Sequence, residues 1–241
     1  MTEVLPKMEF TVTEEKAKLP VIIAAAGSSS RMGTNKQLLE IGSIPVIART
    51  MLAFERCDII SRIILVTRAE DIFTLQMLGK KYGISKLSDI VCGGSSRAES
   101  VLNGFKQLTD SETAVLIHDG ARPFVTDKII TSVADGLKEH LAVTCAVKVK
   151  DTIKQVDKNG KVITTPDRDS LVAVQTPQGV RVKEYVAAAN SAKDISVFTD
   201  DMSVMESAGH SVYTVEGSYK NIKITTPEDV LSAEVFLGED I

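Results

Sequence analysis

The amino-acid sequence predicts an α/β fold in which a mostly parallel sheet is flanked by helices. Short apolar runs alternate with helical segments of about a dozen residues, which is the pattern of βαβ units. The runs VIIAA, IILV and AVLI are continuously apolar, as expected of strands that are buried on both faces of a parallel sheet. With 241 residues, the chain is long enough to bury the core of one large domain.

The first half of the chain supplies the alternation. Strands are expected where apolar or β-branched residues run together and a polar loop follows, at 21–25, 59–67, 89–92, 114–118 and 143–147. Helices are expected where apolar residues recur three or four positions apart, around Ile47, Met51 and Phe54 and over 71–82, 98–108 and 129–137. Because ligands bind beyond the carboxyl ends of parallel strands, the loops after the strands at 21–25, 89–92 and 114–118 should share one face.

The alternation stops after Val149. Two short strands, 151–156 and 161–165, are expected around Asn159-Gly160, a dipeptide typical of two-residue hairpin turns. An isolated hairpin is only marginally stable in water, so this arm is expected to pack against another subunit. Helices near 182–191 and after Thr199 and strands at 212–215 and 221–224 should follow. The last helix is expected to begin at Thr226-Pro227, an N-cap residue and a first-turn proline.

Composition limits the class of protein. The net charge of −4 gives no general affinity for nucleic acid, and the three cysteines are far apart without a CxxC pair. No apolar run approaches the roughly 18 residues that span a bilayer. The protein is therefore expected to be cytoplasmic, without a membrane or nucleic-acid partner. Residues 1–19 are predicted to be a flexible extension of a single domain formed by residues 20–241.

Three loops carry the polar residues that suggest chemistry. The first, AAAGSSSRMGTNK over residues 24–36, is rich in small residues and brings Arg31 and Lys36 to a loop whose amides can hold phosphate. It lacks the spacing of a Walker A loop and of GxGxxG, and a tight surface turn with two solvated cations is the alternative. The second, GGSSRAES over 93–100, suits a base edge or an anion at a helix N-terminus, or is simply a cap.

The third loop, HDGARP over 118–123, places an acid at the end of a strand. Asp119 and Arg122 suit the handling of a metal ion or a phosphate, and a buried ion pair between them is the structural alternative. His118 is expected to be a packed residue. Farther along, Thr199 and Asp200 are expected by default to start a helix, whereas Lys223 interrupts a segment that otherwise looks buried.

Taken together, these segments closely resemble the family of 2-C-methyl-D-erythritol 4-phosphate cytidylyltransferases. The resemblance runs from about Pro20 to Phe236 and rests on AAAGSSSRMGTNKQ, GGSSRAES, HDGARPF, VKDTIK, QTPQ, TDD and NIKITTPEDV, in this order. It implies a Rossmann-like nucleotidyltransferase fold with a protruding β-hairpin arm over about 148–173 that builds a homodimer. The implied reaction joins CTP to 2-C-methyl-D-erythritol 4-phosphate with release of pyrophosphate and dependence on Mg²⁺, within non-mevalonate isoprenoid biosynthesis.

The same resemblance assigns roles to individual residues. Arg31 and Lys36 match the family's transition-state stabilisers, and Arg168 and Lys223 match residues that position the acceptor phosphate. The positions that resemble the CTP pocket are Ala25, Ala26, Gly27, Gly94, Ser95 and Ser100. Those that resemble the acceptor side are Asp119, Arg122, Thr152, Thr176 and Thr199, with Asp119 also beside the metal, which the CTP phosphates mainly hold.

Three other functions remain open at the level of sequence. A ribitol 5-phosphate cytidylyltransferase would share the chemistry with a different acceptor, and a sugar-1-phosphate nucleotidyltransferase would use another base. A nucleotide-binding module without turnover belongs to a different class, but it would have no use for Arg31 and Lys36 beside Lys223.

Overall fold

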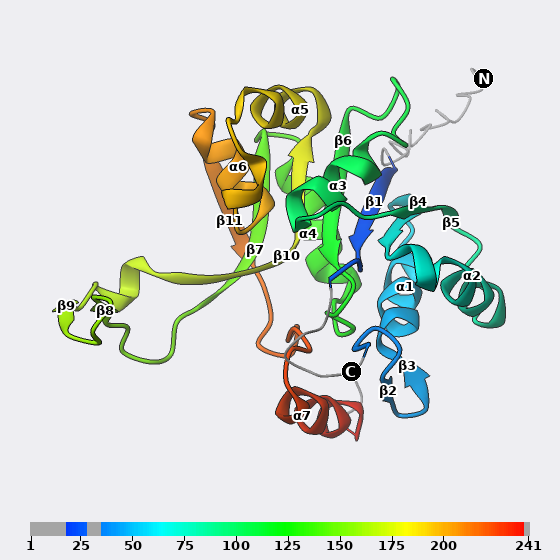
Figure 1. Cartoon of the computed structure of the whole chain (residues 1–241), viewed down its shortest axis with the longest axis horizontal. Helices are drawn as coiled ribbons and strands as arrows, with labels where there is room; N and C mark the ends of the chain where they lie inside the picture. Colours follow the sequence, from blue (N-terminus) through cyan, green and yellow to red (C-terminus); the bar gives the residue numbers. More distant parts are fainter. Residues whose placement is uncertain (1–17, 28–34, 239–241) are drawn as a thin grey trace, which may run out of the picture.

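A seven-stranded sheet forms the centre of the molecule (Figure 1), as seen in a computed structural model that describes residues 18–27 and 35–238. Its strand order is β11-β7-β10-β6-β1-β4-β5, and every neighbouring pair is parallel except the two pairs that involve β10. The strands are β1 (Leu19–Ala24), β4 (Ile60–Thr67), β5 (Leu87–Cys92), β6 (Ala114–Asp119), β7 (Ala142–Lys148), β10 (Val172–Arg181) and β11 (Val212–Glu216).

Helices cover both faces of this sheet. The α-helices are α1 (Val46–Arg56), α2 (Ile72–Lys81), α3 (Arg97–Phe105), α4 (Asp127–Gly136), α5 (Val182–Ser191), α6 (Asp201–Ser207) and α7 (Pro227–Gly238). Short 3₁₀ turns occupy η1 (Ala69–Asp71), η2 (Arg168–Ser170) and η3 (Ile195–Val197). Two small hairpins complete the fold, β2 (Glu40–Ile41) with β3 (Ile44–Pro45), and β8 (Gln155–Val156) with β9 (Val162–Thr164).

The alternation of side chains along the strands builds a core on each side of the sheet. In β1, Val21 and Ile23 pack with residues of α1, α2 and α4, whereas Ile22 packs with residues of α3, α5 and α6. All three are fully buried, and burial of each such side chain stabilises the fold by about 1.5–3 kcal/mol. The central strands are therefore held firmly from both faces, so the loops at their carboxyl ends start from fixed positions.

Most of the predicted elements are confirmed, including proline in the first turn of the last helix, but the prediction of a strand at 221–224 is wrong. This segment crosses the carboxyl edge of the sheet without joining a ladder, although the amide of Ile224 donates to the carbonyl of Ala121 at 2.8 Å. The strand β10 was not predicted, because its polar stretch from Gln175 to Gln178 does not read as a buried strand. These polar side chains are nevertheless buried, between β6 and β7.

The predicted arm is present and projects from the body of the molecule between β7 and β10 (Figure 1). Its turn differs from the predicted two-residue form. Gly160 has a φ of +81°, but the only non-glycine residue with positive φ in the described chain is Ser43, so Asn159 does not form a type I′ turn. The carboxylate of Asp157 instead accepts the amides of Asn159 and Lys161, at 2.8 and 3.0 Å, and closes a longer loop.

The described part of the chain contains no helix that is long and apolar enough to cross a membrane.

Candidate functional site

Three loops meet at the carboxyl edge of the sheet, as their order in the sequence predicted. Backbone hydrogen bonds continue past the strand ends and fix each loop to its neighbour. Ala25 N donates to the carbonyl of Val66 at 2.7 Å, and Gly93 N donates to that of Thr67 at 2.8 Å. Gly120 N also donates to the carbonyl of Ala24 at 2.9 Å. The three loops are therefore held in fixed positions relative to one another at this edge.

The approach of the first and second loops requires glycine at position 93. A Cβ atom there would overlap the Cβ of Ala26 and would lie 2.8 Å from Ser100 Oγ. The same hydroxyl accepts a hydrogen bond from Gly94 N at 3.0 Å. The start of α3 is thereby held against the loop that follows β1.

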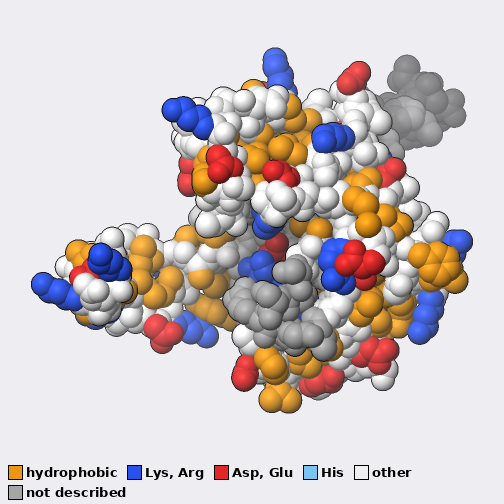
Figure 2. Space-filling view, in the orientation of Figure 1, with side chains coloured by type: hydrophobic (Ala, Val, Ile, Leu, Met, Phe, Trp, Pro, Cys, Tyr) orange, Lys and Arg blue, Asp and Glu red, His pale blue; other side chains and the backbone are white. Residues whose placement is uncertain are grey.

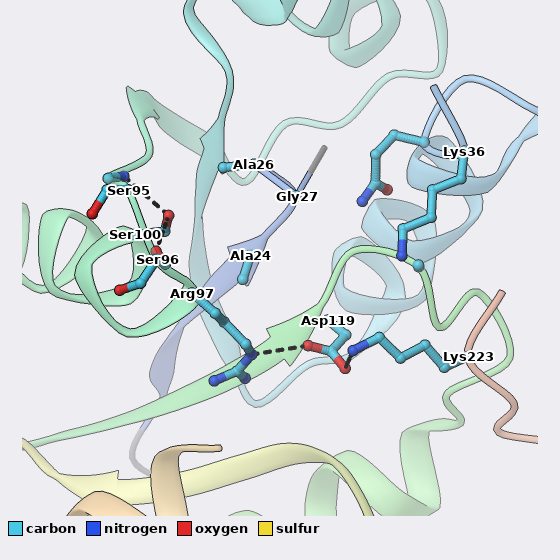
Figure 3. Close-up of a pocket in the computed structure, with 13 residues that line it drawn as sticks. Ala24, Ala26, Gly27, Lys36, Ser95, Ser96, Arg97, Ser100, Asp119 and Lys223 are labelled. Carbon is cyan, nitrogen blue, oxygen red and sulfur yellow. Dashed lines mark hydrogen bonds and ion pairs between the residues drawn. The ribbon is translucent and has the colours of Figure 1, made fainter. Parts of the chain in front are cut away.

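A cavity of about 480 Å³ lies between these loops (Figure 3). Lys36, Arg97 and Lys223 enter it from three separate segments and converge near Asp119. Among the described lining residues, three cations face one carboxylate, which makes this cavity suited to an anion. Of the residues predicted to form the site, it is lined by Ala26, Gly27, Lys36, Gly94, Ser95, Ser100, Asp119 and Lys223.

A second cavity of about 240 Å³ adjoins the first. It is lined by four of the residues predicted for the acceptor side, Asp119, Arg122, Thr176 and Thr199. The two cavities share Arg97, Asp119 and Lys223. The arrangement is therefore a pair of adjoining spaces with a common charged wall, which allows two anionic molecules to be brought end to end.

Asp119 is the electrostatic centre of this wall. Its carboxylate lies 2.8 Å from Lys223 Nζ, 3.3 Å from Arg97 Nε and 3.5 Å from Arg122 Nε. Burial alone would raise the pKa of Asp119, but the three surrounding cations outweigh it and hold that pKa well below its ordinary value. The carboxylate is therefore fully ionised at neutral pH. The predicted alternative, an ion pair between Asp119 and Arg122, is present as one part of this larger cluster.

His118 is a neutral side chain buried next to Asp119. Burial lowers its pKa to about 4, so it carries no charge at physiological pH. Thr176 Oγ1 lies 3.1 Å from His118 Nδ1 and accepts the amide of Asp119 at 3.0 Å. The hydroxyl thus donates to Nδ1, which leaves Nε2 to donate to the carbonyl of Arg122 at 3.1 Å. His118 is a packed residue, as predicted, and fixes the backbone around Asp119.

Asn221 explains how Lys223 reaches the site. Its buried side chain donates to the carbonyl of Thr176 at 2.9 Å, and its own carbonyl accepts from Arg122 Nη1 at 2.8 Å. These contacts tie the extended segment to β10 and to the loop after β6. Lys223 therefore faces Asp119 (Figure 3), where strand alternation alone would allow it to face solvent.

Three of the described residues predicted for the site line neither cavity. Ala25 is buried in the core, so only its backbone can serve a ligand. Arg168 and Thr152 lie on the arm, where Arg168 Nη1 donates to the carbonyl of Lys150 at 2.9 Å. Arg31 lies outside the described residues.

Sequence reasoning assigned no role to Arg97 or to Asp201, which pairs with it at 2.8 Å. Both carried a signal. Arg97 is the first residue of α3, where the helix dipole disfavours a cation, so an arginine there indicates a specific anionic partner. Asp200 caps α6 by accepting a hydrogen bond from the amide of Ser203 at 3.0 Å. The helix start therefore needs only Asp200, and a second acid beside it, Asp201, indicates another partner.

The described ranges contain no group of three histidine, cysteine or acidic side chains that could hold a metal ion. Among the described residues that line the larger cavity, Asp119 is the single carboxylate, so a metal ion there would take most of its ligands from other groups.

Comparisons with known proteins agree with this geometry. The family profile described as 2-C-methyl-D-erythritol 4-phosphate cytidylyltransferase matches residues 19–239. The enzyme of that name from Bacillus thuringiensis (strain Al Hakam) is 46% identical over 220 residues, 90% of this chain and 96% of the relative. The one from Alkaliphilus metalliredigens (strain QYMF) is 42% identical over 227 residues, 92% of this chain and 94% of the relative.

Solved structures give the same result. The crystal structure of 4-diphosphocytidyl-2C-methyl-D-erythritol synthase from Anaerococcus prevotii DSM 20548 superposes with a TM-score of 0.83 at 32% identity. The match covers 93% of this chain and 97% of that one. From the profile, the relatives and the shared Rossmann-like fold together, the chain belongs to the family of 2-C-methyl-D-erythritol 4-phosphate cytidylyltransferases.

Proposed function

We propose that the protein transfers the cytidylyl group of CTP to 2-C-methyl-D-erythritol 4-phosphate. The products are 4-diphosphocytidyl-2-C-methyl-D-erythritol and pyrophosphate, in the formation of isoprenoid precursors. The observation that carries this proposal is the pair of adjoining cavities that share Arg97, Asp119 and Lys223. A reaction that joins two phosphate compounds needs such a common wall at the point where they meet.

The larger cavity is assigned to CTP. Its two sides come from the loop after β1 and from the loop before α3, whose close approach depends on Gly93. Gly27, Gly94 and Ser95 line it without bulky side chains, and Lys36 supplies positive charge. The smaller cavity is assigned to the acceptor, because Arg122 suits its phosphate, and Thr176 and Thr199 suit its hydroxyl groups.

The chemistry requires no covalent intermediate. A phosphate oxygen of the acceptor attacks the α-phosphorus of CTP and forms a new P–O bond, while the bond to the β-phosphate breaks and pyrophosphate departs. The attacking oxygen is already anionic, so no strong general base is needed. The main task of the protein is to hold two anions together and to stabilise the extra charge. Lys36 and Lys223 perform this task, with Arg31 assigned to it by its place in the family motif.

Mg²⁺ is proposed as the cofactor, with Asp119 as its protein ligand. Mg²⁺ is commonly held by one or two carboxylates together with substrate phosphates, so a lone ionised carboxylate beside a nucleotide cavity fits this ion. Bound there, the ion would neutralise charge on the phosphates. Asp119 pairs with Arg97 through one carboxylate oxygen and with Lys223 and Arg122 through the other, so an ion bound there would share the carboxylate with these cations.

A homodimer built by the arm is also proposed. Figure 2 shows apolar side chains along the projecting arm. The exposed apolar residues of this segment are Ile153, Val156, Val162, Ile163, Val172 and Val174. A second subunit packed against the arm would remove these apolar side chains from water. The arm also carries Thr152 and Arg168, which lie in neither cavity of their own chain, so the proposal places them in the acceptor site of the partner.

A substrate panel tests the function. Purified protein is incubated with Mg²⁺, one nucleotide and one acceptor, and release of pyrophosphate is measured. Turnover is expected with CTP and 2-C-methyl-D-erythritol 4-phosphate, and much less with UTP, ATP or GTP. A higher kcat/KM with ribitol 5-phosphate would reassign the acceptor, and binding of CTP without pyrophosphate release would make the protein a nucleotide-binding module.

A further inference from the structure

Arg97 occupies the boundary between the two cavities. It begins α3, and its guanidinium group contacts Asp119 on one side and Asp201 on the other, at 3.3 and 2.8 Å. Figure 3 shows the side chain reaching across the cavity wall towards Asp119. Within the described part of the chain, three residues line both spaces: Arg97, Asp119 and Lys223.

The position is unfavourable for a cation unless specific partners hold it there. The helix dipole repels positive charge at the first residue of α3. Burial alone would also lower the pKa of Arg97, but the carboxylates of Asp201 and Asp119 outweigh it and raise that pKa above its ordinary value. The guanidinium group is therefore permanently charged, and two carboxylates stabilise it at the boundary.

Asp201 is itself anchored in the core. It is 1% exposed, and its second carboxylate oxygen accepts from Tyr185 Oη at 2.9 Å. Its amide donates to Gln178 Oε1 at 2.9 Å. Tyr185 in turn stacks on Phe105 of α3, with ring centroids 4.5 Å apart and an angle of 13° between the planes. Tyr185 of α5 thus holds the carboxylate of Asp201 and Gln178 of β10 holds its amide, and this fixed carboxylate holds Arg97.

This support leaves part of the guanidinium group available. Two of its nitrogens, Nε and Nη2, donate to the acidic residues, whereas Nη1 makes no hydrogen bond to any residue of the described chain. A guanidinium group carries five N–H donors in one plane and binds phosphate through pairs of them. Arg97 lines both the proposed CTP site and the proposed acceptor site.

We propose that Arg97 is a catalytic residue that binds phosphate oxygens where nucleotide and acceptor meet, and that Asp201 and Tyr185 are positioning residues that act through it. The inference rests on the proposed function. Arg97 neither gives nor takes a proton. It holds the two phosphate groups in line while the new P–O bond forms and the bond to pyrophosphate breaks, and it stabilises the negative charge that develops.

The test of Arg97 uses Arg97→Lys and Arg97→Ala, with Arg62→Lys and Arg62→Ala as matched controls. Arg62 is also partly buried and is paired with two acids, Glu112 and Asp89, but it lies in neither cavity. Arg97→Lys is expected to lower kcat by about a hundredfold, because an ammonium group cannot pair with Asp201 and reach the phosphates together. Millimolar guanidinium should restore activity to Arg97→Ala by about tenfold or more, through the lost hydrogen bonds. The Arg62 variants should lose thermal stability while keeping kcat within about twofold.

The positioning role is tested by a double-mutant cycle. Tyr185→Phe removes one hydrogen bond to Asp201, keeps the stacked ring, and should lower kcat by about fivefold with little change in KM for CTP. If it acts through Arg97, adding it to Arg97→Ala should change kcat no further. A purely structural role would lower the activity of both backgrounds by the same factor, which would overturn the positioning assignment.

Other outcomes separate this inference from the proposed function. If the wild-type protein releases pyrophosphate but Arg97→Lys and Tyr185→Phe match it, the role of Arg97 is wrong and the function stands. Failure of guanidinium to restore any activity to folded Arg97→Ala also contradicts a direct contact with substrate. If the wild-type protein does not turn over CTP with any acceptor, both are overturned.

Discussion

Among single residues, Lys36 offers the most direct test of how charge is used in the larger cavity. Lys36→Ala removes a cation from the proposed CTP site while leaving the core untouched. The lost contact to the developing charge on the α-phosphate should cost about 3 kcal/mol, or about a hundredfold in kcat. The measurement is steady-state turnover together with thermal unfolding.

Lys128→Ala is the control for this substitution, since Lys128 is exposed on α4 and lines neither cavity. Its kcat should match that of the wild-type protein. A Lys36→Ala protein with wild-type turnover would remove Lys36 from the mechanism.

Asp119 gives the prediction that concerns the metal ion. Chelation of divalent cations should abolish turnover, and added Mg²⁺ should restore it. Asp119→Asn removes the ionised ligand, so the Mg²⁺ concentration for half-maximal activity should rise by about tenfold or more. A titration of turnover against Mg²⁺ measures this. An unchanged midpoint would show that the ion relies on the nucleotide alone.

The sequence predicted the residues of the site that lie in loops after buried strands, because strand direction alone brings these loops together. It did not predict the support behind them. Asp201 and Tyr185 meet Arg97 only through the packing of α5 and α6 on the sheet, and no spacing in the sequence encodes that contact. The loop that carries Arg31 lies outside the described residues, so its predicted role stays a prediction.

At the scale of elements, the arm is expected to hold two subunits together. Deletion of residues 154–162 removes β8, its turn and the first residue of β9, including exposed apolar residues Val156 and Val162. The protein should then shift from dimer towards monomer in sedimentation velocity at micromolar concentration, because the apolar surface that pairing would bury is lost. An unchanged dimer would place the interface elsewhere on the molecule.

Arg62 ties three elements together at the opposite end of the sheet. On β4, it donates to Asp89 of β5 at 2.9 Å, and to Gln107 O and Glu112 after α3. The hydrogen bond from Arg62 is the main cause that holds the pKa of Glu112 below its ordinary value, although burial opposes it. Glu112 therefore stabilises the fold only while it is ionised.

Glu112→Gln should reduce the free energy of unfolding by about 1–2 kcal/mol at pH 7. The folded pKa is lowered, so the contribution is complete above the unfolded pKa of about 4.3 and is lost as pH falls through the folded pKa. Urea denaturation at a series of pH values should show the two proteins converging below about pH 4. Asp110→Asn, at an exposed neighbouring residue, should change little, and a difference independent of pH would show that packing rather than charge is responsible.

The elements themselves were largely predictable where one physical signal dominated. Apolar runs identified the parallel strands, and three-to-four spacing identified α1, α3 and α4. The strand β10 was not predicted because its buried side chains are polar. Their hydrogen bonds with Asn221, Asp200 and Thr144 form only in the folded chain. The composition of segment 221–224 is that of a strand. Its hydrogen bonds, however, run to side chains and to isolated backbone carbonyls, and not to the backbone of a neighbouring strand.

For the whole molecule, we expect each active site to contain residues of both subunits, because the arm carries Arg168 towards the partner. If Arg168 serves the partner's acceptor cavity, then Arg168→Ala and Lys36→Ala damage the same site from different chains. Mixing the two nearly inactive proteins should form heterodimers with one doubly damaged site and one intact site. Random exchange should recover about a quarter of wild-type activity, if the sites act independently. Subunit exchange verified by mass, without recovery, would place Arg168 in the site of its own chain.

The strand β10 has a consequence for how the protein can vary in length. It runs from the base of the arm through Thr176 and Gln178 and leads directly into α5, which carries Tyr185. The strand is irregular between Val174 and Gln178, but from Gln178 to Arg181 it pairs with β6 in continuous register, so one residue inserted there would turn each later side chain towards the wrong face. The loop from Asp157 to Lys161 has no such constraint, because it joins β8 and β9, which pair with each other in a small sheet separate from the central one. Among functional relatives, insertions and deletions should therefore accumulate at the tip of the arm and be absent between Gln178 and Arg181, a pattern that genomic sequences can decide without an experiment.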